Sequence, residues 1–363
     1  MSINLPPSSL PRVVIAGGGF AGLKLAQALD SSFFQIILID HHNYHQFPPL
    51  IYQVASSGLE PSSIAFPFRA AFKRKKNFIF RLANVIGVEP EQKQLITSVG
   101  EVPYDYLVLA CGGTTNYFGN EQVAKHSLPM KTLYESMNLR NVLLQNIEKA
   151  LVSDKPETRE ALLTVVIVGG GPSGVEIAGA LAEMKRYVLP KDYPYMETDQ
   201  FKIHLIDASP RLLQAMSEKS SRTAAEGLTS LGVEIHHNMM VTDYDGRVLT
   251  LGDGTKMNTR TVIWVSGIIA NTVEGIQADS LGRGKRILVD GYNEVRGVPD
   301  VFALGDQCLM TADPAYPQGH PQMAQVAIQQ AALLAKNLKA RLTGAKQQTF
   351  RYKDLGSMAT IGR

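Results

Sequence analysis

The stretch "VVIVGGGPSGVEIAG" at residues 165–179 decides the fold, because a close copy, "VVIAGGGFAGLKLAQ", stands at residues 13–27. Each copy has a β-branched run, three glycines and then a helical pattern. In such a unit the first glycine permits the tight turn, the second lets a pyrophosphate approach the backbone, and the third lets helix and strand pack closely. The helix N-terminus adds free N–H groups and a positive dipole end. We therefore expect an α/β fold with two Rossmann-like dinucleotide-binding domains.

The strand expected after each glycine loop ends in an aspartate. "FQIILID" ends at Asp40, and "FKIHLID" ends at Asp207. A carboxylate at Asp40 can accept hydrogen bonds from the hydroxyls of an adenosine ribose. At Asp207 it favours NAD(H) over NADP(H), because a 2′-phosphate would meet a negative charge. Two loops imply two different dinucleotides bound at once, and the chemistry between them is hydride transfer from a nicotinamide to a flavin.

Two further segments assign the loops. "GVPDVFALGDQC" at 297–308 is similar to the segment with which two-dinucleotide flavoproteins place an Asp, here Asp306, on the ribityl chain of FAD. "YDYLVLACGG" at 104–113 resembles the segment where the chain leaves the FAD domain of those proteins. The first loop is therefore assigned to FAD and the second to NADH. We expect the NADH domain to be inserted in a discontinuous FAD domain, with the NADH domain at 116–290 and the FAD domain at 1–115 and 291–345.

Composition narrows the class of protein. The 363 residues, 45% hydrophobic and 19% charged, are enough for more than one core. A net charge of +3, with no basic helix that interleaves aromatics, gives no support for nucleic-acid binding. The two cysteines, Cys111 and Cys308, are far apart, which disfavours a disulfide framework, a metal cluster or a dithiol relay. The N-terminus lacks a secretory signal pattern, and no apolar run is long enough to span a bilayer, so we expect a soluble or peripheral, intracellular protein.

Two polar clusters have ordinary explanations. His41, His42 and His45 suggest a metal site, but no second ligand cluster supports one, so a loop that lines the nucleotide site is the preferred interpretation and no metal is expected. The basic run Arg69–Lys76, "RAAFKRKK", is read as a solvated loop or helix end, with attraction to anionic lipid as the alternative.

Together these motifs resemble the type II NADH:quinone oxidoreductases, the single-subunit respiratory NADH dehydrogenases. The resemblance spans nearly the whole chain, and its motifs are "NYHQFPPLIYQVASSGLEPSSIAFPFR" at 43–69, "NYFG" at 116–119, "MKTLYESMNLRN" at 130–141, "GGGPSGVE" at 169–176, "TVIWVSGIIAN" at 261–271, "ALGDQ" at 303–307 and "AQVAIQQ" at 324–330. It implies hydride transfer from NADH to N5 of a tightly but non-covalently bound FAD, followed by two-electron reduction of a membrane quinone, menaquinone or ubiquinone, without proton pumping.

The resemblance and the loops give a set of expected site residues. For FAD these are Gly17, Gly18, Gly19, Phe20, Ala21, Gly22, Asp40, His41, Asn43, His45, Val85, Ala110, Gly112, Gly305, Asp306, Ala324 and Gln325. For NADH they are Gly169, Gly170, Gly171, Pro172, Ser173, Gly174, Glu176, Asp207, Ser266 and Gly267.

The A-Q-x-x-x-Q pattern implies a quinone site at Gln325 and Gln329, which lie four apart and so share a helix face. A helix N-terminus at 322–325 would point at the flavin and stabilise negative charge on its reduced form. Without the resemblance, both glutamines and Gln330 would be read as polar positions of an exposed helix. Glu176 is the expected catalytic acid, placed in the first turn of its helix. Stabilisation of the helix dipole is the simpler role, but a nearby pyrophosphate favours a role near nicotinamide and flavin, orienting NADH and quinone and relaying protons.

Three departures qualify the resemblance. The family commonly has Thr-Gly where this chain has Cys111-Gly112, and often a basic residue after the position of Asp40. Residues 346–363 correspond to the start of a C-terminal region that carries amphipathic helices for membrane attachment, so we expect peripheral binding at the cytoplasmic face of the inner or plasma membrane through residues absent from this sequence.

A homodimer is a further expectation. The alternatives are a flavoprotein NADH oxidase, a ferredoxin reductase, a sulfide:quinone oxidoreductase and a non-enzymatic NADH sensor.

Overall fold

The computed structural model describes residues 3–362, which divide into two compact units. Unit 1 contains the described residues up to His45, together with Phe66–Thr114 and Ile268–Leu355. Unit 2 contains Gln46–Ala65, Thr115–Gly267 and the described residues from Gly356 onward. Each unit is built on one of the two glycine-loop segments.

The centre of unit 1 is a five-stranded parallel sheet in the order β21-β9-β1-β2-β5. Its strands are β1 (Arg12–Ala16), β2 (Gln35–Asp40), β5 (Phe78–Leu82), β9 (Tyr106–Leu109) and β21 (Val301–Ala303). They read as continuous apolar runs because both faces of the sheet are covered.

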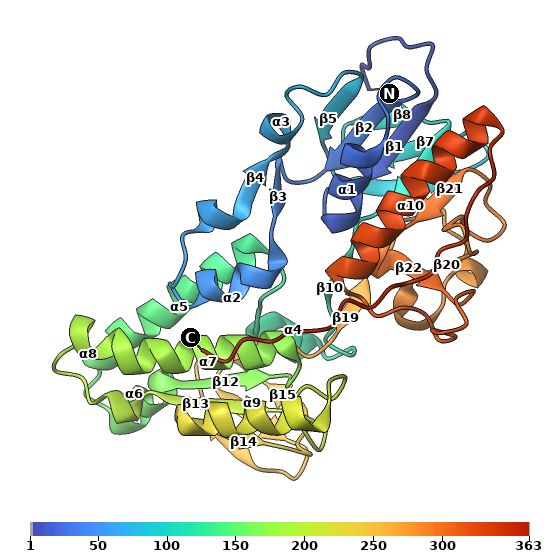
Figure 1. The fold of residues 1–363 in the computed structure, drawn as a ribbon. Coiled ribbons are helices and arrows are strands. Elements are labelled where there is room, and N and C mark those ends of the chain that lie inside the picture. The colour runs from blue at the N-terminus through green and yellow to red at the C-terminus, as the bar shows by residue number, and fades with distance from the viewer. Residues whose placement is uncertain (1–2, 363) are drawn as a thin grey trace. The chain divides into compact units, whose positions relative to one another are not determined.

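The two faces of this sheet bury alternate residues of β1. Val13 and Ile15 pack against helices α1 (Phe20–Ala28) and α10 (Ala324–Thr343), which lie side by side in Figure 1. Val14 and Ala16 pack against an antiparallel three-stranded sheet on the other face. The period of two that a strand imposes on its side chains produces this division. The strands of the second layer are β6 (Val85–Glu89), β7 (Gln94–Thr97) and β8 (Gly100–Pro103).

Unit 2 repeats this plan. Its parallel sheet has the order β11-β18-β12-β13-β14, and Val166 and Ile206 face a three-stranded antiparallel sheet across an apolar cluster. The parallel strands are β11 (Leu128–Pro129), β12 (Thr164–Val168), β13 (Lys202–Ile206), β14 (Val233–His236) and β18 (Thr261–Trp264). The antiparallel strands are β15 (Val241–Tyr244), β16 (Val248–Leu251) and β17 (Lys256–Asn258). The longer helices are α5 (Leu133–Leu151), α7 (Pro172–Tyr187) and α9 (Glu218–Ser230).

The remaining elements are short. The helices are α2 (Ile51–Ala55), α3 (Phe68–Ala71), α4 (Glu121–His126), α6 (Pro156–Leu163) and α8 (Leu189–Asp192). The strands are β3 (Tyr44–Gln46), β4 (Ala65–Pro67), β10 (Gly113–Thr115), β19 (Ile268–Ala270), β20 (Ile287–Val289) and β22 (Cys308–Met310). Single turns of 3₁₀ helix occur at Pro48–Leu50, Pro61–Ile64, Thr198–Gln200, Ala278–Ser280, Arg283–Lys285 and Gly305–Gln307.

The α/β class and the two Rossmann-like parallel sheets agree with the sequence-based expectation, but the unit boundaries fall elsewhere. Residues 268–290, expected in the second domain, belong to unit 1, because β19 pairs with β10 and β20 pairs with β22. Residues 46–65, expected in the first, belong to unit 2. The pairings that decide these boundaries join segments far apart in the sequence.

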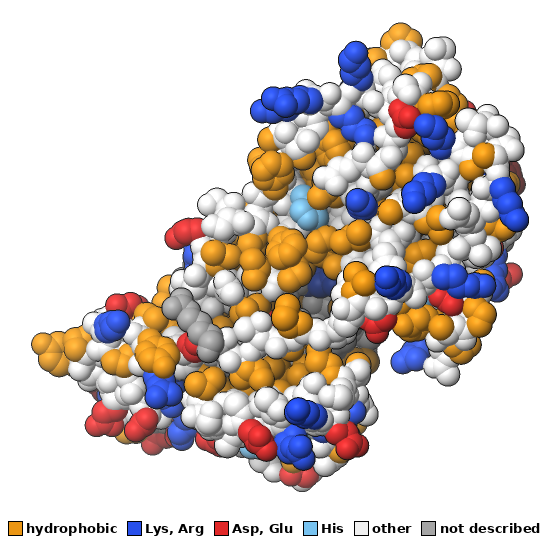
Figure 2. Space-filling model, in the orientation of Figure 1, with side chains coloured by type: hydrophobic (Ala, Val, Ile, Leu, Met, Phe, Trp, Pro, Cys, Tyr) orange, Lys and Arg blue, Asp and Glu red, His pale blue; other side chains and the backbone are white. Residues whose placement is uncertain are grey.

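Two surface expectations can be compared with the described residues. Lys75, in the basic run, donates hydrogen bonds to the carbonyls of Gln27 and Leu29 at the end of α1, which satisfies groups that a helix C-terminus leaves open. On the face drawn in Figure 2, Lys and Arg side chains lie scattered among neutral and hydrophobic ones. Among residues 3–362, no helix combines the length and apolarity required to cross a bilayer.

Candidate functional site

The first glycine loop connects β1 to α1 in unit 1. Gly17 has a φ of +102°, and a Cβ there would lie 2.3 Å from the Ala110 carbonyl oxygen. A Cβ at Gly22 would lie 1.8 Å from the Gly17 carbonyl oxygen, so both positions exclude a side chain. At Gly19, by contrast, a Cβ would meet no atom within 4 Å. The open space at Gly19, at the N-cap of α1, is where a phosphate can approach the backbone.

Asp40 fastens this loop from the end of β2. One carboxylate oxygen accepts the Gly18 N–H at 2.6 Å, and the other accepts the His42 N–H at 2.7 Å. The side chain of His45 contributes a second tie, because its Nδ1 lies 2.9 Å from the Gly18 carbonyl oxygen. A carboxylate has about four acceptor directions, so Asp40 retains capacity for ribose hydroxyls. Asp40 therefore fixes the backbone of the first glycine loop and keeps acceptor directions free.

Residues from distant segments meet the same loop. The Ala110 N–H donates to the Ala16 carbonyl, which brings the end of β9 beside the end of β1. Gly305, with a φ of +64°, packs between Ala21 of α1 and Ala327 of α10. The expected FAD residues Phe20, Ala21, Ala110, Gly305, Asp306 and Ala324 therefore converge at the carboxyl ends of the parallel strands, the usual ligand position in such sheets.

The other expected FAD residues lie in less direct positions. Asn43 accepts the Phe68 N–H with its backbone carbonyl, and Gly112 likewise accepts the Asn271 N–H. Exposed His41 packs its ring against His42. Val85 lies on β6 and packs against the apolar cluster that contains Ala16 and Ile39.

The second glycine loop, in unit 2, has the same construction. Gly169 has a φ of +119°, and a Cβ at Gly174 would lie 1.8 Å from the Gly169 carbonyl oxygen. Gly171, at the N-cap of α7, has no atom within 4 Å of a built Cβ. Ser266, which follows β18, passes so close that a Cβ at Gly169 would be 2.9 Å from its backbone nitrogen. The exposed Pro172 and Ser173 open the helix, and Gly267 follows Ser266 with a φ of +87°.

Asp207 plays the part in unit 2 that Asp40 plays in unit 1. Its carboxylate accepts the Gly170 N–H and, at 2.6 Å, the Ser209 N–H. Its backbone N–H donates to the His236 carbonyl at 2.9 Å, which fixes the residue against β14. The two loops therefore share a strand-end acid that holds the middle glycine.

Glu176 lies in the second turn of α7 and not, as expected, in the first. The first turn of α7 contains no acid, because the helix begins at Pro172 and places Glu176 at the start of the second turn. The first-turn placement was therefore wrong. Stabilisation of the helix dipole, the simpler role considered for Glu176, is disfavoured as well, because the dipole effect falls off within the first turn. Burial raises the pKa of Glu176 to about 7, against which a 3.5 Å hydrogen bond from the Thr360 N–H acts only in part. A pKa in this range leaves Glu176 less readily ionised at neutral pH than an ordinary glutamate.

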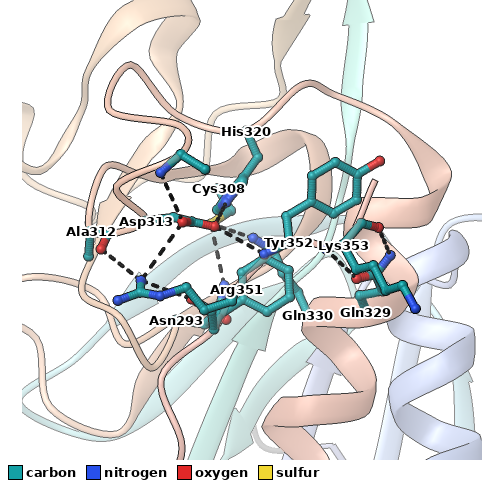
Figure 3. Close-up of polar contacts among 12 residues, drawn as sticks. Asn293, Cys308, Ala312, Asp313, His320, Gln329, Gln330, Arg351, Tyr352 and Lys353 are labelled. Atoms are coloured by element: carbon teal, nitrogen blue, oxygen red, sulfur yellow. Dashed lines mark hydrogen bonds and ion pairs between the residues drawn. The ribbon is translucent and has the colours of Figure 1, made fainter. Parts of the chain in front are cut away.

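The two expected quinone glutamines face one segment of unit 1. Gln329 and Lys353 exchange two hydrogen bonds, with the Gln329 amide donating at 2.9 Å and the Lys353 N–H donating at 3.1 Å (Figure 3). Gln325 accepts hydrogen bonds from the Tyr352 hydroxyl and the Leu355 N–H, both at 3.2 Å. Both side chains thus hold the chain after α10 against the helix, whose N-terminus lies at Ala324 as expected.

Tyr352 contacts a buried Asp–His pair that was not predicted from the sequence. Asp313 accepts hydrogen bonds from the Tyr352 N–H and the His320 ring, both at 3.0 Å (Figure 3). Burial acts to raise the pKa of Asp313, but the hydrogen bonds from His320, Tyr352 and Ala315 outweigh it and lower that pKa. Asp313 therefore stays ionised and keeps the 350–353 segment in place.

Two more glutamines have structural roles that a sequence alone does not reveal. Gln330, which would be an exposed polar position without the family resemblance, is buried and accepts the Gly305 N–H at 2.8 Å. Gln307 is also buried, accepts the Cys111 N–H at 2.6 Å and donates to the Asn271 carbonyl. The motifs "ALGDQ" and "AQVAIQQ" contained both residues, but only the fold supplies their partners.

Both cysteines have raised pKa values. Burial raises the pKa of Cys111 to about 12 and that of Cys308 to about 11. A thiolate, not a thiol, is the nucleophile in thiol chemistry. The raised pKa values therefore disfavour the reactive form of both thiols at neutral pH, although Cys111 is partly exposed.

Comparison with known proteins agrees with this geometry. Residues 11–331 match the pyridine nucleotide-disulphide oxidoreductase family, so the chain belongs to that class of protein. It is 35% identical over its full length to a type II NADH:quinone oxidoreductase of Mycobacterium tuberculosis, covering 81% of that protein. A second enzyme of that description from the same organism is 33% identical over 97% of this chain and 77% of its own. Within the class, the chain belongs to the type II NADH:quinone oxidoreductases.

A solved structure shows the same fold. Plasmodium falciparum NDH2 in complex with NADH superposes with a TM-score of 0.89 at 21% identity, covering 97% of this chain and 88% of that one. At this identity the similarity concerns the fold.

Proposed function

We propose that this protein oxidises NADH through a non-covalently bound FAD and passes two electrons to a quinone without pumping protons. When bound, FAD supplies the hydride acceptor and the two-electron store for that reaction. The observation that carries the proposal is the duplicated loop, in which Asp40 holds Gly18 and Asp207 holds Gly170. Two such loops in one chain of this family fit two dinucleotides.

The residues of unit 1 fit FAD. Gly19 leaves room for a pyrophosphate at the N-terminus of α1, where backbone N–H groups and the helix dipole favour phosphate. Asp40 would accept the ribose hydroxyls, and Asp306, in the turn after β21, would contact the ribityl chain. The N-terminus of α10 would stabilise negative charge on the reduced flavin.

The residues of unit 2 fit NADH. Gly171 leaves the corresponding space for a pyrophosphate, and Asp207 would accept ribose hydroxyls while repelling a 2′-phosphate. Glu176, with its pKa of about 7, would orient NADH and exchange a proton during quinone reduction. A general acid works best when its pKa is near the working pH.

For the quinone, the proposal places Gln325 and Gln329 beside the ring, with Tyr352 holding Gln325 in position. Menaquinone or ubiquinone would reach this site from the membrane, to which the protein would bind peripherally at the cytoplasmic face. Assembly as a homodimer belongs to the same proposal.

An anaerobic absorption experiment tests the proposed function. The purified protein should show the bands of a bound flavin, which bleach on adding NADH and return on adding a quinone. A protein without bound flavin, or a flavin that NADH does not bleach, would refute the proposal.

A further inference from the structure

We infer that unit 2 carries a binding site for a divalent transition-metal ion, formed by His204, Glu234 and His236. His204 lies on β13, and the other two residues lie on the neighbouring edge strand β14. The parallel register pairs His204 with Glu234, and Glu234 and His236 are two apart. Because side chains alternate between the faces of a sheet, the three side chains project from the same face.

The spacing of the three side chains suits a metal ion. His204 Nδ1 lies 3.1 Å from His236 Nε2 and 3.4 Å from a carboxylate oxygen of Glu234, and the three ligating atoms lie within 4.8 Å of one another. Two ligand atoms about 2.1 Å from a tetrahedral Zn²⁺ are roughly 3.4 Å apart. The two separations measured from His204 Nδ1 are therefore close to those of metal ligands.

The chemistry of the three groups favours the same ion. Imidazole nitrogens suit zinc, copper, iron and nickel, and two imidazoles with one carboxylate leave coordination positions open for water. Neutral imidazole is the metal-binding form of histidine.

The proposed metal site is accessible to solvent, and the positive charge near it is offset by an ion pair. The Glu234 side chain is 61% exposed, so an ion can enter from solvent, whereas His204 is buried and fixed by the sheet. Lys202, a cation whose charge acts on His204, forms a 2.7 Å ion pair with Glu160, which offsets its charge.

A second cluster, Asp40 with His41 and His42, also has its ligating atoms within 4.8 Å of one another but is a poorer ligand set. Both carboxylate oxygens of Asp40 already accept backbone N–H groups, and the residue belongs to the first glycine loop. This cluster serves as an internal comparison for the proposed site.

Metal binding would act on the strand that carries the nucleotide acid. The ligands join β13 to β14, and the Asp207 N–H donates to the carbonyl of His236 itself. A metal ion at His236 would stabilise this strand pair next to the second glycine loop. The inference stands independently of which electron acceptor the protein uses.

Calorimetric titration of the chelator-treated holoprotein with Zn²⁺ tests the inference. We expect one Zn²⁺ per chain, with affinity reduced at least about tenfold by either His236→Ala or Glu234→Gln, since loss of even an outer-shell partner costs about 10–100-fold. Glu234→Gln changes an exposed side chain and keeps its shape, so its folding is not in question. His126→Ala, on α4 of the same unit, is the matched control and should bind as the unchanged protein does.

Three outcomes would overturn the inference. These are no stoichiometric Zn²⁺ binding, binding that neither His236→Ala nor Glu234→Gln weakens, and binding that is lost in a His41→Ala/His42→Ala variant while both unit 2 variants retain it. Thermal unfolding gives a second readout, because Zn²⁺ should raise the Tm of the unchanged protein and not that of Glu234→Gln.

Discussion

The carboxylate of Asp207 accepts the backbone N–H of Gly170, and the same contact recurs in unit 1, where Asp40 accepts the N–H of Gly18 at 2.6 Å. In each unit the acid at the end of one strand holds the middle of the loop that follows the neighbouring strand. The acid thus fixes the backbone that would face a pyrophosphate and keeps lone pairs free for the proposed ribose contact. This repeated relationship leads to the first prediction.

Asp207→Asn should raise the KM for NADH about tenfold and reduce discrimination against NADPH. A hydrogen bond to a charged group is worth about 1.5–3 kcal/mol, and removing the charge also removes the repulsion of a 2′-phosphate. Steady-state kinetics with both nucleotides measure the change. Asp192→Asn, at an exposed position on α8, is the control. Unchanged KM values in Asp207→Asn would show that the acid does not contact the nucleotide.

The open positions Gly19 and Gly171 offer a test of which loop holds which cofactor. Alanine fits at both positions. The φ angle is −66° at Gly19 and −74° at Gly171, and a Cβ built at either position would meet no atom within 4 Å. Its methyl group would instead occupy the space proposed for a pyrophosphate. Gly19→Ala should therefore lower the flavin content of the folded protein, whereas Gly171→Ala should retain flavin and raise the KM for NADH.

Absorbance for flavin content and circular dichroism for folding give the readout for this pair. The opposite pattern, with flavin lost in Gly171→Ala, would reverse the assignment of the loops. Gly22→Ala is not informative in the same way, because its methyl would lie 1.8 Å from the Gly17 carbonyl oxygen and would disturb the fold itself.

Glu176→Gln should stabilise the protein at alkaline pH. The folded protein holds the Glu176 proton up to about pH 7, whereas an unfolded chain releases it near 4.5, so the folded state binds more protons between these values. Stability then falls as pH rises through this window, and the charged form is disfavoured above it. The substitution should raise the free energy of unfolding above pH 7 and change it little below pH 4.5. Because Glu176 is only partly buried and solvent screens its charge, the gain should be well below the roughly 3 kcal/mol that the full pKa shift would give.

Denaturant unfolding at pH 4 and pH 8 measures this difference. Turnover should fall in the same variant if Glu176 also exchanges a proton during quinone reduction. Equal stability of the two proteins at pH 8 would mean that Glu176 is ionised without cost.

Gln329→Ala should weaken quinone use without slowing flavin reduction by NADH. The substitution removes both hydrogen bonds to Lys353 and frees the segment that Gln325 and Tyr352 also hold. We expect a severalfold higher KM for quinone and an unchanged rate of NADH-driven bleaching in stopped flow. Lys336→Ala, an exposed position on the same helix, is the control. A slower bleaching step with normal quinone kinetics would contradict the placement.

The thiols should be inert in the native protein. Burial raises the pKa of both Cys111 and Cys308 to about 11 or higher, so titration with a thiol reagent at pH 8 should detect neither until the protein is denatured. Rapid modification of either cysteine in the native state would reopen thiol chemistry and the sulfide:quinone alternative.

Local patterns predicted the elements that position the site. A buried strand, three glycines and a helix succeed one another within about fifteen residues, so β1–α1 and β12–α7 could be placed from the chain itself. The strand-end acids Asp40 and Asp207 followed from the same reasoning. The pattern did not fix the residue at which α7 starts, and the observed start at Pro172 places Glu176 outside the first turn.

Contacts between residues far apart in the chain could not be predicted from the sequence. Gln330 and Gln307 look like surface residues until Gly305 and Asn271 are brought to them by the fold. The unit boundary at Gly267 depends on pairing between β19 and β10, and the ligand atoms of His204 and His236 meet only through the register of β13 and β14. Each of these features requires contacts between segments separated by many residues.

The rate at which different acceptors reoxidise the NADH-reduced protein tests the central claim most directly. Stopped-flow mixing under anaerobic conditions would compare menaquinone and ubiquinone analogues with ferredoxin, and a separate mixing experiment would use oxygen. The proposed function predicts that a quinone restores the flavin absorbance far faster than oxygen or ferredoxin does. Reoxidation that is fastest with ferredoxin or oxygen, or that no acceptor achieves at a useful rate, would contradict it.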